Sequence, residues 1–180
     1  MKHVYFMTGF PGFLATKLIK KLIEADSFFE RAYLLVLPAF ESKARQEATL
    51  IEKDLNIGEG LLEVITGDIT EDRLELDSGS AFEEVTHVFH LAAIYDLAVP
   101  RDVAYEVNVI GTRNMNNWVS TLPSLKRYIY FSTAYVAGKR EGLLLETELV
   151  RPAAFKNFYE ETKFEAELLV EQLKSCLSPL

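Results

Sequence analysis

Cysteine is scarce in this chain of 180 residues: Cys176 is the single one, so no disulfide can close within the chain. A chain without internal disulfides is typical of a reducing compartment, and we expect a cytoplasmic protein. Glycine and proline are also few, nine and six, which excludes a collagen-like or low-complexity chain. Because 49% of the residues are apolar, the chain can build a core, and its length predicts one domain over residues 1–180.

Positive charge and long apolar runs are lacking as well. Nineteen Lys and Arg residues against 27 Asp and Glu give a net charge of −8, which argues against binding of nucleic acid or of an anionic membrane surface. No stretch approaches the ~20 apolar residues of a membrane helix. The apolar run at Val4–Met7 is too short for a signal peptide. We therefore expect a soluble protein with no membrane span and no nucleic-acid partner.

Several common catalytic motifs are missing from the sequence. It contains no Walker phosphate-binding sequence, no nucleophile elbow and no cluster with metal-ligand spacing. His87 and His90 are three residues apart on one predicted strand, so their side chains would point to opposite faces of the sheet. That arrangement disfavours joint metal binding, and we expect no metal site.

What the sequence does contain is an alternation of short β-rich runs with longer helical segments. The predicted strands are Val4–Met7, Tyr33–Leu37, Leu62–Thr66, Thr86–Leu91 and Arg127–Ser132. The predicted helices are Phe13–Ala25, Glu41–Leu55, Arg101–Ser120 and Phe158–Cys176, with a weak helix within Gly79–Glu84. Strands that are apolar throughout are typical of a parallel sheet buried on both faces. The pattern predicts an α/β fold, a Rossmann-type doubly wound sheet of five strands with the first strand in the centre.

Ligands of such sheets bind at the carboxyl ends of the strands, so the residues after each strand are the candidates. The first strand is followed by a glycine turn with the pattern G-x-x-G-x-x-A, whose residues are Gly9, Phe10, Pro11, Gly12, Phe13, Leu14 and Ala15. Gly9 would permit the tight turn, and Gly12 would let the backbone approach a pyrophosphate at the helix N-terminus. An ordinary glycine-rich loop is the alternative. The position between first strand and first helix favours a dinucleotide site.

The end of the second strand bears on the choice between NAD and NADP. An NAD site usually has an acidic residue there for the ribose hydroxyls, but the sequence has Leu37 and Pro38. Lys43 and Arg45 follow and could reach a 2′-phosphate, or they could be solvated charges on a helix surface. On balance the residues lean toward NADP over NAD.

The ends of the third and fourth strands supply further cofactor candidates. Asp68 and Ile69 follow the third strand, and Asp68 could accept from an adenine amino group or cap its own turn. The small residues of Leu91-Ala92-Ala93 follow the fourth strand, where the backbone would pass close to a cofactor. A buried strand end is the plainer interpretation of that segment.

Hydroxyl and amine side chains make up the candidate catalytic group. Ser132 and Thr133 end the fifth strand and could bind a substrate carbonyl or satisfy their own turn. Tyr159 and Lys163 are four residues apart at the start of the last helix, so they share a face. An ammonium beside a phenol favours the phenolate, which makes a tyrosine a usable general acid or base. The pair at 135 and 139 has the same spacing but contains a glycine and follows a strand, so we favour Tyr159 and Lys163.

Asn108 is a polar residue on the predicted fourth helix, flanked by Val103, Val107 and Ile110. If it is buried, its amide needs partners. A structural hydrogen bond and a functional role both remain open for it.

Taken in chain order, these motifs resemble the extended short-chain dehydrogenase/reductase family. The segments that start at Thr8, Tyr33 and Ser132 look most like its thioester-reductase and fatty-acyl-reductase branch, of the male-sterility type. The resemblance implies that Tyr159 is the general acid/base, that Lys163 holds the nicotinamide ribose and lowers the tyrosine pKa, and that Asn108 supports a proton-relay water. It also implies that Thr133, with Ser132 as its neighbour, orients the substrate carbonyl. The implied cofactor-binding residues are Gly9, Phe10, Pro11, Gly12, Phe13, Leu14, Asp68, Ile69, Leu91, Ala92, Ala93, Asn108, Ser132, Tyr159 and Lys163.

The resemblance implies an NAD(P)-dependent oxidoreductase that moves hydride between nicotinamide and a carbonyl-level carbon of a small molecule, an acyl thioester or an aldehyde. A nucleotide-sugar epimerase or dehydratase and a non-catalytic NAD(P)-binding sensor are the alternatives. Family members continue with two more strands and a C-terminal substrate region, whereas this sequence ends at Leu180. We therefore expect the cofactor half of a longer enzyme, or a shortened form, inactive alone. Its fifth strand, with the uncharged segment Tyr128–Phe131, would be an open edge that favours a homodimer.

Overall fold

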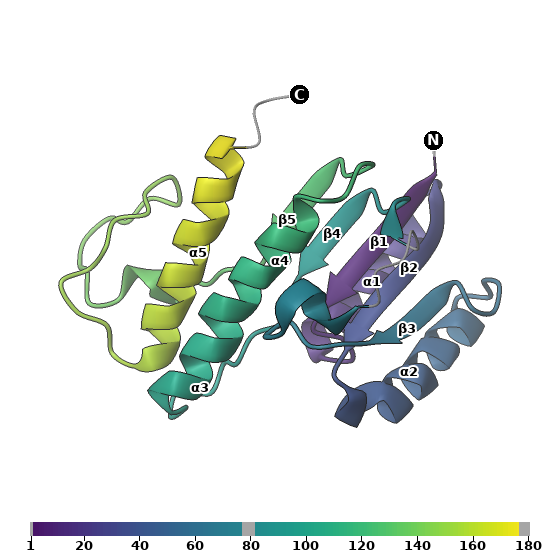
Figure 1. Cartoon of the computed structure of the whole chain (residues 1–180), viewed down its shortest axis with the longest axis horizontal. Helices are drawn as coiled ribbons and strands as arrows, with labels where there is room; N and C mark the ends of the chain where they lie inside the picture. The colour runs from purple at the N-terminus through teal and green to yellow at the C-terminus, as the bar shows by residue number, and fades with distance from the viewer. Residues whose placement is uncertain (1, 77–81, 177–180) are drawn as a thin grey trace.

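The computed structural model describes residues 2–76 and 82–176, and within them it shows a five-stranded parallel sheet with the order β3-β2-β1-β4-β5 (Figure 1). The strands are β1 (His3–Thr8), β2 (Phe29–Val36), β3 (Leu62–Thr66), β4 (His87–His90) and β5 (Arg127–Tyr130). The main helices are α1 (Phe13–Ala25), α2 (Glu41–Asp54), α3 (Arg101–Tyr105), α4 (Gly111–Val119) and α5 (Phe158–Cys176). This is the predicted Rossmann-type doubly wound sheet, with β1 at its centre.

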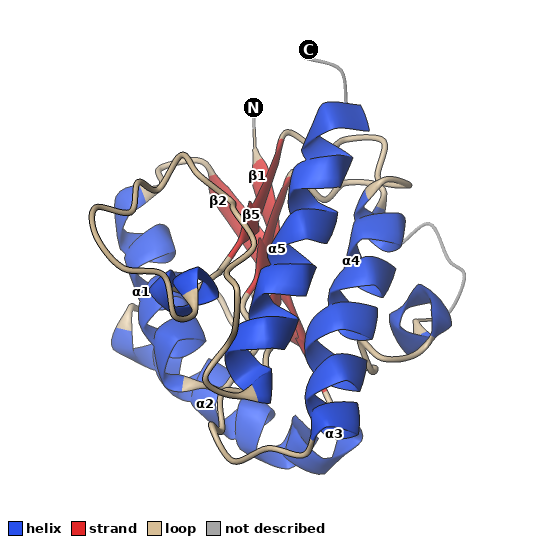
Figure 2. Cartoon of the chain, turned by 90° about the vertical axis from the view of Figure 1, so that its left-hand side faces the viewer, coloured by secondary structure: helices blue, strands red, loops and turns tan. Residues whose placement is uncertain are grey.

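Helices cover both faces of the sheet, with α1 and α2 on one side and α4 and α5 on the other (Figure 2). The alternation of side chains along β1 divides the core accordingly. Tyr5 and Met7 pack in one apolar layer with Ile19 of α1, and Val4 and Phe6 pack in a second layer. Because helices cover both faces, β1 and the second half of β2 are buried almost throughout, as the sequence indicated for the strands of such a sheet.

The predicted helix Arg101–Ser120 is divided by a π-helical turn, η4 (Glu106–Ile110), between α3 and α4. Gly111 directly after this turn packs against Ile69, since a Cβ at Gly111 would lie 2.7 Å from Ile69 Cδ1. Hydrophobic periodicity does not distinguish a π turn from an α turn of this length. Single π turns are frequent at functional sites, and η4 carries Asn108.

Most predicted boundaries agree with the structure within one residue, and two differ by more. The helices at Phe13–Ala25 and Phe158–Cys176 have the predicted ends. β2 begins at Phe29 instead of Tyr33, because its first residues pair with β1 from His3 onward. β5 ends at Tyr130, which leaves Ser132 in the following loop. Half of the weak helix expected within 79–84, residues 79–81, lies outside the described residues. Among the described helices, none is long and apolar enough to cross a membrane.

Candidate active site

The glycine turn lies directly against the segment that follows β4. Gly9 has φ +86°, a conformation that L side chains rarely adopt. A Cβ there would lie 2.9 Å from the backbone N of Ala92 and from the carbonyl carbon of Leu91. Gly9 is therefore required both by its backbone angle and by the close approach of a neighbouring chain segment.

Gly12 is required by the turn itself, a reason that adds to the pyrophosphate approach predicted from the sequence. Its N–H donates to the Gly9 carbonyl over 2.9 Å, and a Cβ on Gly12 would lie 2.6 Å from that same oxygen. The turn itself thus excludes a side chain at Gly12, before any ligand is considered. Phe10 is buried in the core rather than directed at solvent, and a cis bond joins it to Pro11.

Gly12 also begins α1, and this helix start is suited to an anion. Gly12 is the N-cap residue of α1, and no side chain of the described residues makes a capping hydrogen bond there. The first turn of α1 contains no acidic residue. Phe13 and Leu14 are exposed at this turn. Free N–H groups and the positive end of the helix dipole attract phosphate groups. This helix start could therefore hold the pyrophosphate of a dinucleotide.

Thr8, the last residue of β1, connects the glycine turn to β4. Its Oγ1 accepts from the N–H groups of Leu91 and Ala92 over 3.2 and 3.0 Å. The same atom lies 2.8 Å from His90 Nδ1, to which the remaining hydroxyl proton can be donated. Burial, together with the nearby Lys163 charge, lowers the pKa of His90 to about 3. His90 is therefore neutral and buried, and it links the glycine turn to the end of β4.

The segment after β3 is held by its own turn. Asp68 Oδ1 accepts from the backbone N and from Oγ1 of Thr70, both over 2.8 Å. Ile69 is buried against Gly111. These contacts are those of the turn-capping alternative for Asp68. Binding of an adenine group by Asp68 and Ile69 stays a prediction.

The end of β2 passes into a short 3-10 turn, η1 (Pro38–Phe40), and then into α2. Arg45 pairs with Glu41 on the surface of α2, with 2.8 Å between Nη2 and Oε1. Lys43 is exposed. The Arg45 ion pair fits the interpretation of a solvated helix face. Lys43 therefore stays the better candidate of the two for a 2′-phosphate.

Lys163 lies deep between α5 and β5 and is only 3% exposed. Its Nζ donates to the hydroxyl oxygen of Tyr130 over 2.6 Å and to the Phe131 carbonyl over 2.8 Å. Burial lowers the pKa of Lys163 to about 8, and the charge of Glu167 opposes that shift. Two of the three N–H groups of the ammonium are thus occupied by β5 and its end, and one is left for a ligand.

The other catalytic candidates lie around this lysine on the same elements. Tyr159 is half-buried one turn before Lys163 on α5, and its hydroxyl makes no hydrogen bond to any described residue. The Thr133 oxygen accepts from Tyr135 N over 3.2 Å, which leaves the Thr133 hydroxyl proton free to donate. The Ser132 hydroxyl instead donates to the Glu167 carboxylate. Of the two neighbouring hydroxyls, Thr133 is therefore the one available to a substrate.

The rival pair, Tyr135 and Lys139, does not share a helix face. Tyr135 lies in the short 3-10 turn η5 (Ala134–Ala137) and is exposed. Gly138 follows with φ +58°, which ends the turn before Lys139. The glycine argument for choosing the pair on α5 is consistent with this geometry.

Asn108 is buried, and every hydrogen of its amide is in use. Its Oδ1 accepts from Ile94 N over 2.9 Å, and its Nδ2 donates to Ile94 O over 3.1 Å and to Thr162 Oγ1 over 3.0 Å. These contacts join η4 to the segment after β4 and to α5. These hydrogen bonds fit the structural role that the sequence left open for Asn108. Its support of a relay water stays a prediction.

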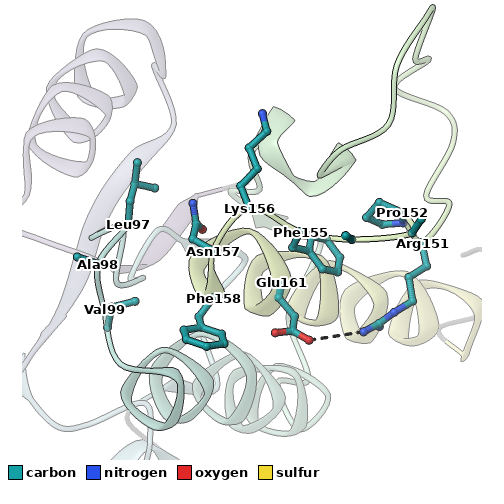
Figure 3. Close-up of a pocket in the computed structure, with 12 residues that line it drawn as sticks. Leu97, Ala98, Val99, Arg151, Pro152, Phe155, Lys156, Asn157, Phe158 and Glu161 are labelled. Carbon is teal, nitrogen blue, oxygen red and sulfur yellow. Dashed lines mark ion pairs between the residues drawn. The ribbon is translucent and has the colours of Figure 1, made fainter.

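A cleft of about 550 Å³ opens beside the first turn of α5 (Figure 3). Leu97 and Val99 from the segment after β4 line one side, and Phe158 of α5 lies between them and the ion pair of Arg151 with Glu161, 3.8 Å apart. Sequence reasoning did not identify this cleft. It adjoins the helix turn that carries Tyr159.

Sequence reasoning also missed Tyr130, the direct partner of Lys163. The signal was a period-two pattern on β5: Tyr128, Tyr130 and Ser132 alternate with apolar residues, so their hydroxyls lie on one face. The structure pairs them in turn with Asn116, Lys163 and Glu167.

Comparison with known proteins shows which sequences the chain is similar to. It is 27% identical to fatty acyl-CoA reductase 1 of Arabidopsis thaliana over 93% of this chain and 38% of that protein. It is 28% identical to the alcohol-forming fatty acyl-CoA reductase of Simmondsia chinensis over 78% and 32%. The chain thus spans less than two-fifths of the length of these curated relatives.

Solved structures show the same fold. The terminal R domain from the myxalamid PKS-NRPS biosynthetic pathway superposes with a TM-score of 0.81 at 24% identity, over 99% of this chain and 47% of that one. UDP-glucuronic acid 4-epimerase from Bacillus cereus, in complex with NAD, gives 0.69 at 21% identity, over 96% and 52%. The sequence profile described as male sterility protein, an NAD-binding family, matches residues 7–179. The chain therefore belongs to the male sterility protein family, within the extended short-chain dehydrogenase/reductases.

Proposed function

We propose that this chain is the cofactor-binding and catalytic part of an NAD(P)-dependent reductase, which reduces a carbonyl-level carbon of an acyl thioester or aldehyde. The observation that carries the proposal is the placement of Lys163. Its buried ammonium is fixed at the carboxyl end of β5 by Tyr130 and Phe131, with one N–H to spare. Tyr159, with an unengaged hydroxyl, lies one turn away on the same helix.

The start of α1 and the glycine turn fit a dinucleotide. Uncapped N–H groups of the residues that follow Gly12 would bind the pyrophosphate, and Leu91-Ala92-Ala93 would lie beside it, since Gly9 already contacts that segment. Lys43, exposed after β2, supports a preference for NADP over NAD. A bound nicotinamide would supply the hydride.

The residues of the chain would then perform the proton chemistry. Lys163 would donate its remaining N–H to the nicotinamide ribose. The free hydroxyl proton of Thr133 would bind the substrate carbonyl oxygen. As hydride arrives at the carbonyl carbon, Tyr159 would give its proton to the developing alkoxide.

The cleft beside the first turn of α5 would receive part of the substrate. Its apolar wall, with Leu97, Val99 and Phe158, suits an acyl chain better than a sugar. The relatives in Arabidopsis and Simmondsia are named as fatty acyl-CoA reductases, which supports the same substrate class.

The test combines binding and turnover, measured on the 180-residue chain and on any longer form of the protein that contains it. NADPH and NADH binding would be measured by calorimetry, and turnover with a panel of acyl-CoA thioesters, aldehydes and nucleotide sugars. Net oxidation of NADPH with a thioester or aldehyde supports a reductase. Isomerised sugar without net oxidation would indicate an epimerase, and binding without chemistry in every form tested would indicate a sensor.

Matched tyrosine variants locate the proton donor. We expect Tyr159→Phe to lower kcat at least about 10²-fold, in the range typical of a lost general acid, with NADPH affinity retained. Tyr135→Phe, at the exposed rival tyrosine, should leave kcat unchanged. Near-normal turnover of Tyr159→Phe would exclude this tyrosine as the proton donor.

A further inference from the structure

Tyr130 holds the lysine of the proposed site, although it belongs to none of the motifs discussed for the sequence. Its hydroxyl oxygen lies 2.6 Å from Lys163 Nζ, and the ammonium also lies 4.2 Å from the centroid of the Tyr130 ring. A hydrogen bond from a charged donor contributes more than one between neutral groups, especially where water is excluded. The contact is therefore strong enough to decide where the ammonium sits.

Tyr130 is itself held in place from the opposite side. The Thr112 side chain on α4 is a hydrogen-bonding neighbour of the Tyr130 hydroxyl, and the His90 ring lies 5.6 Å from the Tyr130 ring, centroid to centroid. His90 Nε2 lies 3.2 Å from Thr112 Oγ1, and His90 Nδ1 meets Thr8 at the glycine turn. A continuous set of buried polar side chains thus runs from the glycine turn to the lysine.

The Tyr130 phenol stays un-ionised in this setting. Burial is the main cause that raises its pKa, and the nearby Tyr128, Glu167 and Tyr159 raise it further against the smaller opposite effect of Thr112. The phenol therefore stays protonated at every pH at which an enzyme works. Its contribution to the site is a fixed acceptor oxygen and a ring face, which position a cation without reacting.

We propose that Tyr130 is a positioning residue, whose hydroxyl fixes the Lys163 ammonium at the carboxyl end of β5 and so directs its one remaining N–H to the cofactor ribose. The part that concerns the ribose rests on the proposed function. The part that concerns the ammonium does not, because Lys163 and Tyr130 can be observed without cofactor or substrate.

The chain offers a closely matched control. Tyr128 is the same residue type on the same strand and the same face, two residues earlier, and its hydroxyl donates to Asn116 Oδ1 over 3.0 Å instead of meeting the lysine. Replacement of either tyrosine by Phe removes one hydroxyl from the interface between β5 and the helices. Only Tyr130→Phe removes an acceptor from Lys163.

The decisive measurement is the protonation of Lys163, followed by NMR of ¹⁵Nζ in lysine-labelled protein between pH 6 and 11 and assigned with Lys163→Met. Three groups face this ammonium: His90 from β4, Tyr130 from β5 and Glu167 from α5. Tyr159, one turn earlier on α5, acts on Tyr130. In the wild type we expect a midpoint near the lowered pKa of about 8. Loss of the Tyr130 acceptor destabilises the charged form, so the midpoint should fall by about half a unit or more in Tyr130→Phe. Tyr128→Phe should leave it in place.

A second readout tests the link to the cofactor. We expect the dissociation constant for NADPH to rise about fivefold or more in Tyr130→Phe and to stay unchanged in Tyr128→Phe. An unchanged or raised Lys163 midpoint in Tyr130→Phe would overturn the proposal. If the wild type binds no dinucleotide, the proposed function fails, while the ¹⁵N titration still decides the role of Tyr130.

The wild type alone provides a check if Tyr130→Phe does not fold. The ¹³Cζ resonance of Tyr130 should shift with the same midpoint as Lys163 Nζ, because the phenol oxygen loses its charged donor at that pH. A Tyr130 resonance that is flat through the Lys163 titration would contradict the proposal.

Discussion

The amide of Asn108 donates to the hydroxyl of Thr162 over 3.0 Å, and this contact joins the π turn η4 to the part of α5 that lies between Tyr159 and Lys163. The two residues are 54 positions apart in the sequence. Thr162 also donates to the Phe158 carbonyl within its own helix, over 2.8 Å. The position of the proposed catalytic helix thus depends on a residue of another helix.

Replacement of Asn108 by Ala should therefore destabilise the fold. It would leave both the N–H and the C=O of Ile94 without their partner, and unsatisfied buried groups cost about 1–3 kcal/mol each. We expect the free energy of unfolding in urea to fall by about 2–4 kcal/mol. Asn117→Ala, at an exposed position of α4, is the control and should change it by less than about 0.5 kcal/mol. A cost below about 1 kcal/mol at Asn108 would mean that water replaces its contacts.

Gly12→Ala tests the glycine turn. Its Cβ would meet the Gly9 carbonyl oxygen at 2.6 Å, so the turn must open and the start of α1 must move. We expect NADPH affinity to fall about tenfold or more, together with a loss of stability of about 1–3 kcal/mol.

Gly58→Ala is the control for that variant, because its Cβ would meet only the Leu61 side chain at an ordinary 3.5 Å. Both effects should be absent there. Unchanged NADPH affinity in Gly12→Ala would remove the glycine turn as the phosphate site.

The pH dependence of stability should report the buried lysine. The pKa of Lys163 is lowered from 10.5 to about 8 in the folded protein, so between these values the unfolded chain binds more protons than the folded one. Stability contributed by this group therefore rises with pH across that window, by at most about 1.4 kcal/mol per pH unit.

Lys163→Met removes this dependence. We expect the stability of the wild type to gain about 2 kcal/mol relative to Lys163→Met between pH 8 and 10, measured by urea unfolding at each pH. Comparison of the two proteins cancels the opposite effect of Tyr5 and Tyr128, whose pKa values burial raises. Parallel pH profiles for the two proteins would show that Lys163 is not held as described.

Variants of the two hydroxyl residues after β5, Ser132 and Thr133, should differ in kcat. Thr133→Val removes the proton that is free to bind a carbonyl oxygen, and we expect kcat to fall about 10²-fold with the cofactor dissociation constant unchanged. Ser132→Ala removes a hydroxyl that already donates to Glu167, so kcat should change by less than about fivefold. Equal losses in the two variants would mean that the hydroxyls act together.

Self-association follows from the place of β5 in the sheet. Within the described residues β5 is an outermost strand, and its segment Tyr128–Phe131 is uncharged. Unpaired strand edges favour pairing with a second chain. We expect sedimentation of the 180-residue chain to show a concentration-dependent dimer, and a monomer at every concentration would show that the edge is protected.

The order of strands and the ends of α1 and α5 could be predicted because they depend on local periodicity and on a general rule of parallel sheets. The division of the helix after Arg101 could not, because η4 results from contacts that Asn108 and Gly111 make with distant segments. The steric need for Gly12 within the turn could not be predicted, since the short distance from its Cβ to the Gly9 oxygen depends on the path of the turn. The approach of a pyrophosphate to Gly12 stays a prediction.

The candidate site, like the fold, could be predicted only in part. The spacing of Tyr159 and Lys163 identified the helix face, but not the strand residue that meets the lysine. That partner is 33 positions away, and the general preference of buried strands for apolar residues concealed it. The sequence could not distinguish Ser132 from Thr133, because the difference lies in their hydrogen bonds: the Ser132 hydroxyl donates to Glu167, whereas the Thr133 oxygen accepts from Tyr135 N.

The alternating hydroxyls of β5 have a consequence for protein engineering. A helix that carries the tyrosine and lysine cannot be transplanted into another parallel sheet by itself, because Lys163 would arrive without Tyr130 to receive it and Glu167 without Ser132. The natural unit of exchange is the strand together with the helix. A chimera that moves Tyr128, Tyr130 and Ser132 along with α5 carries its own acceptors, and the host scaffold needs to supply only an apolar surface for the other face of the strand.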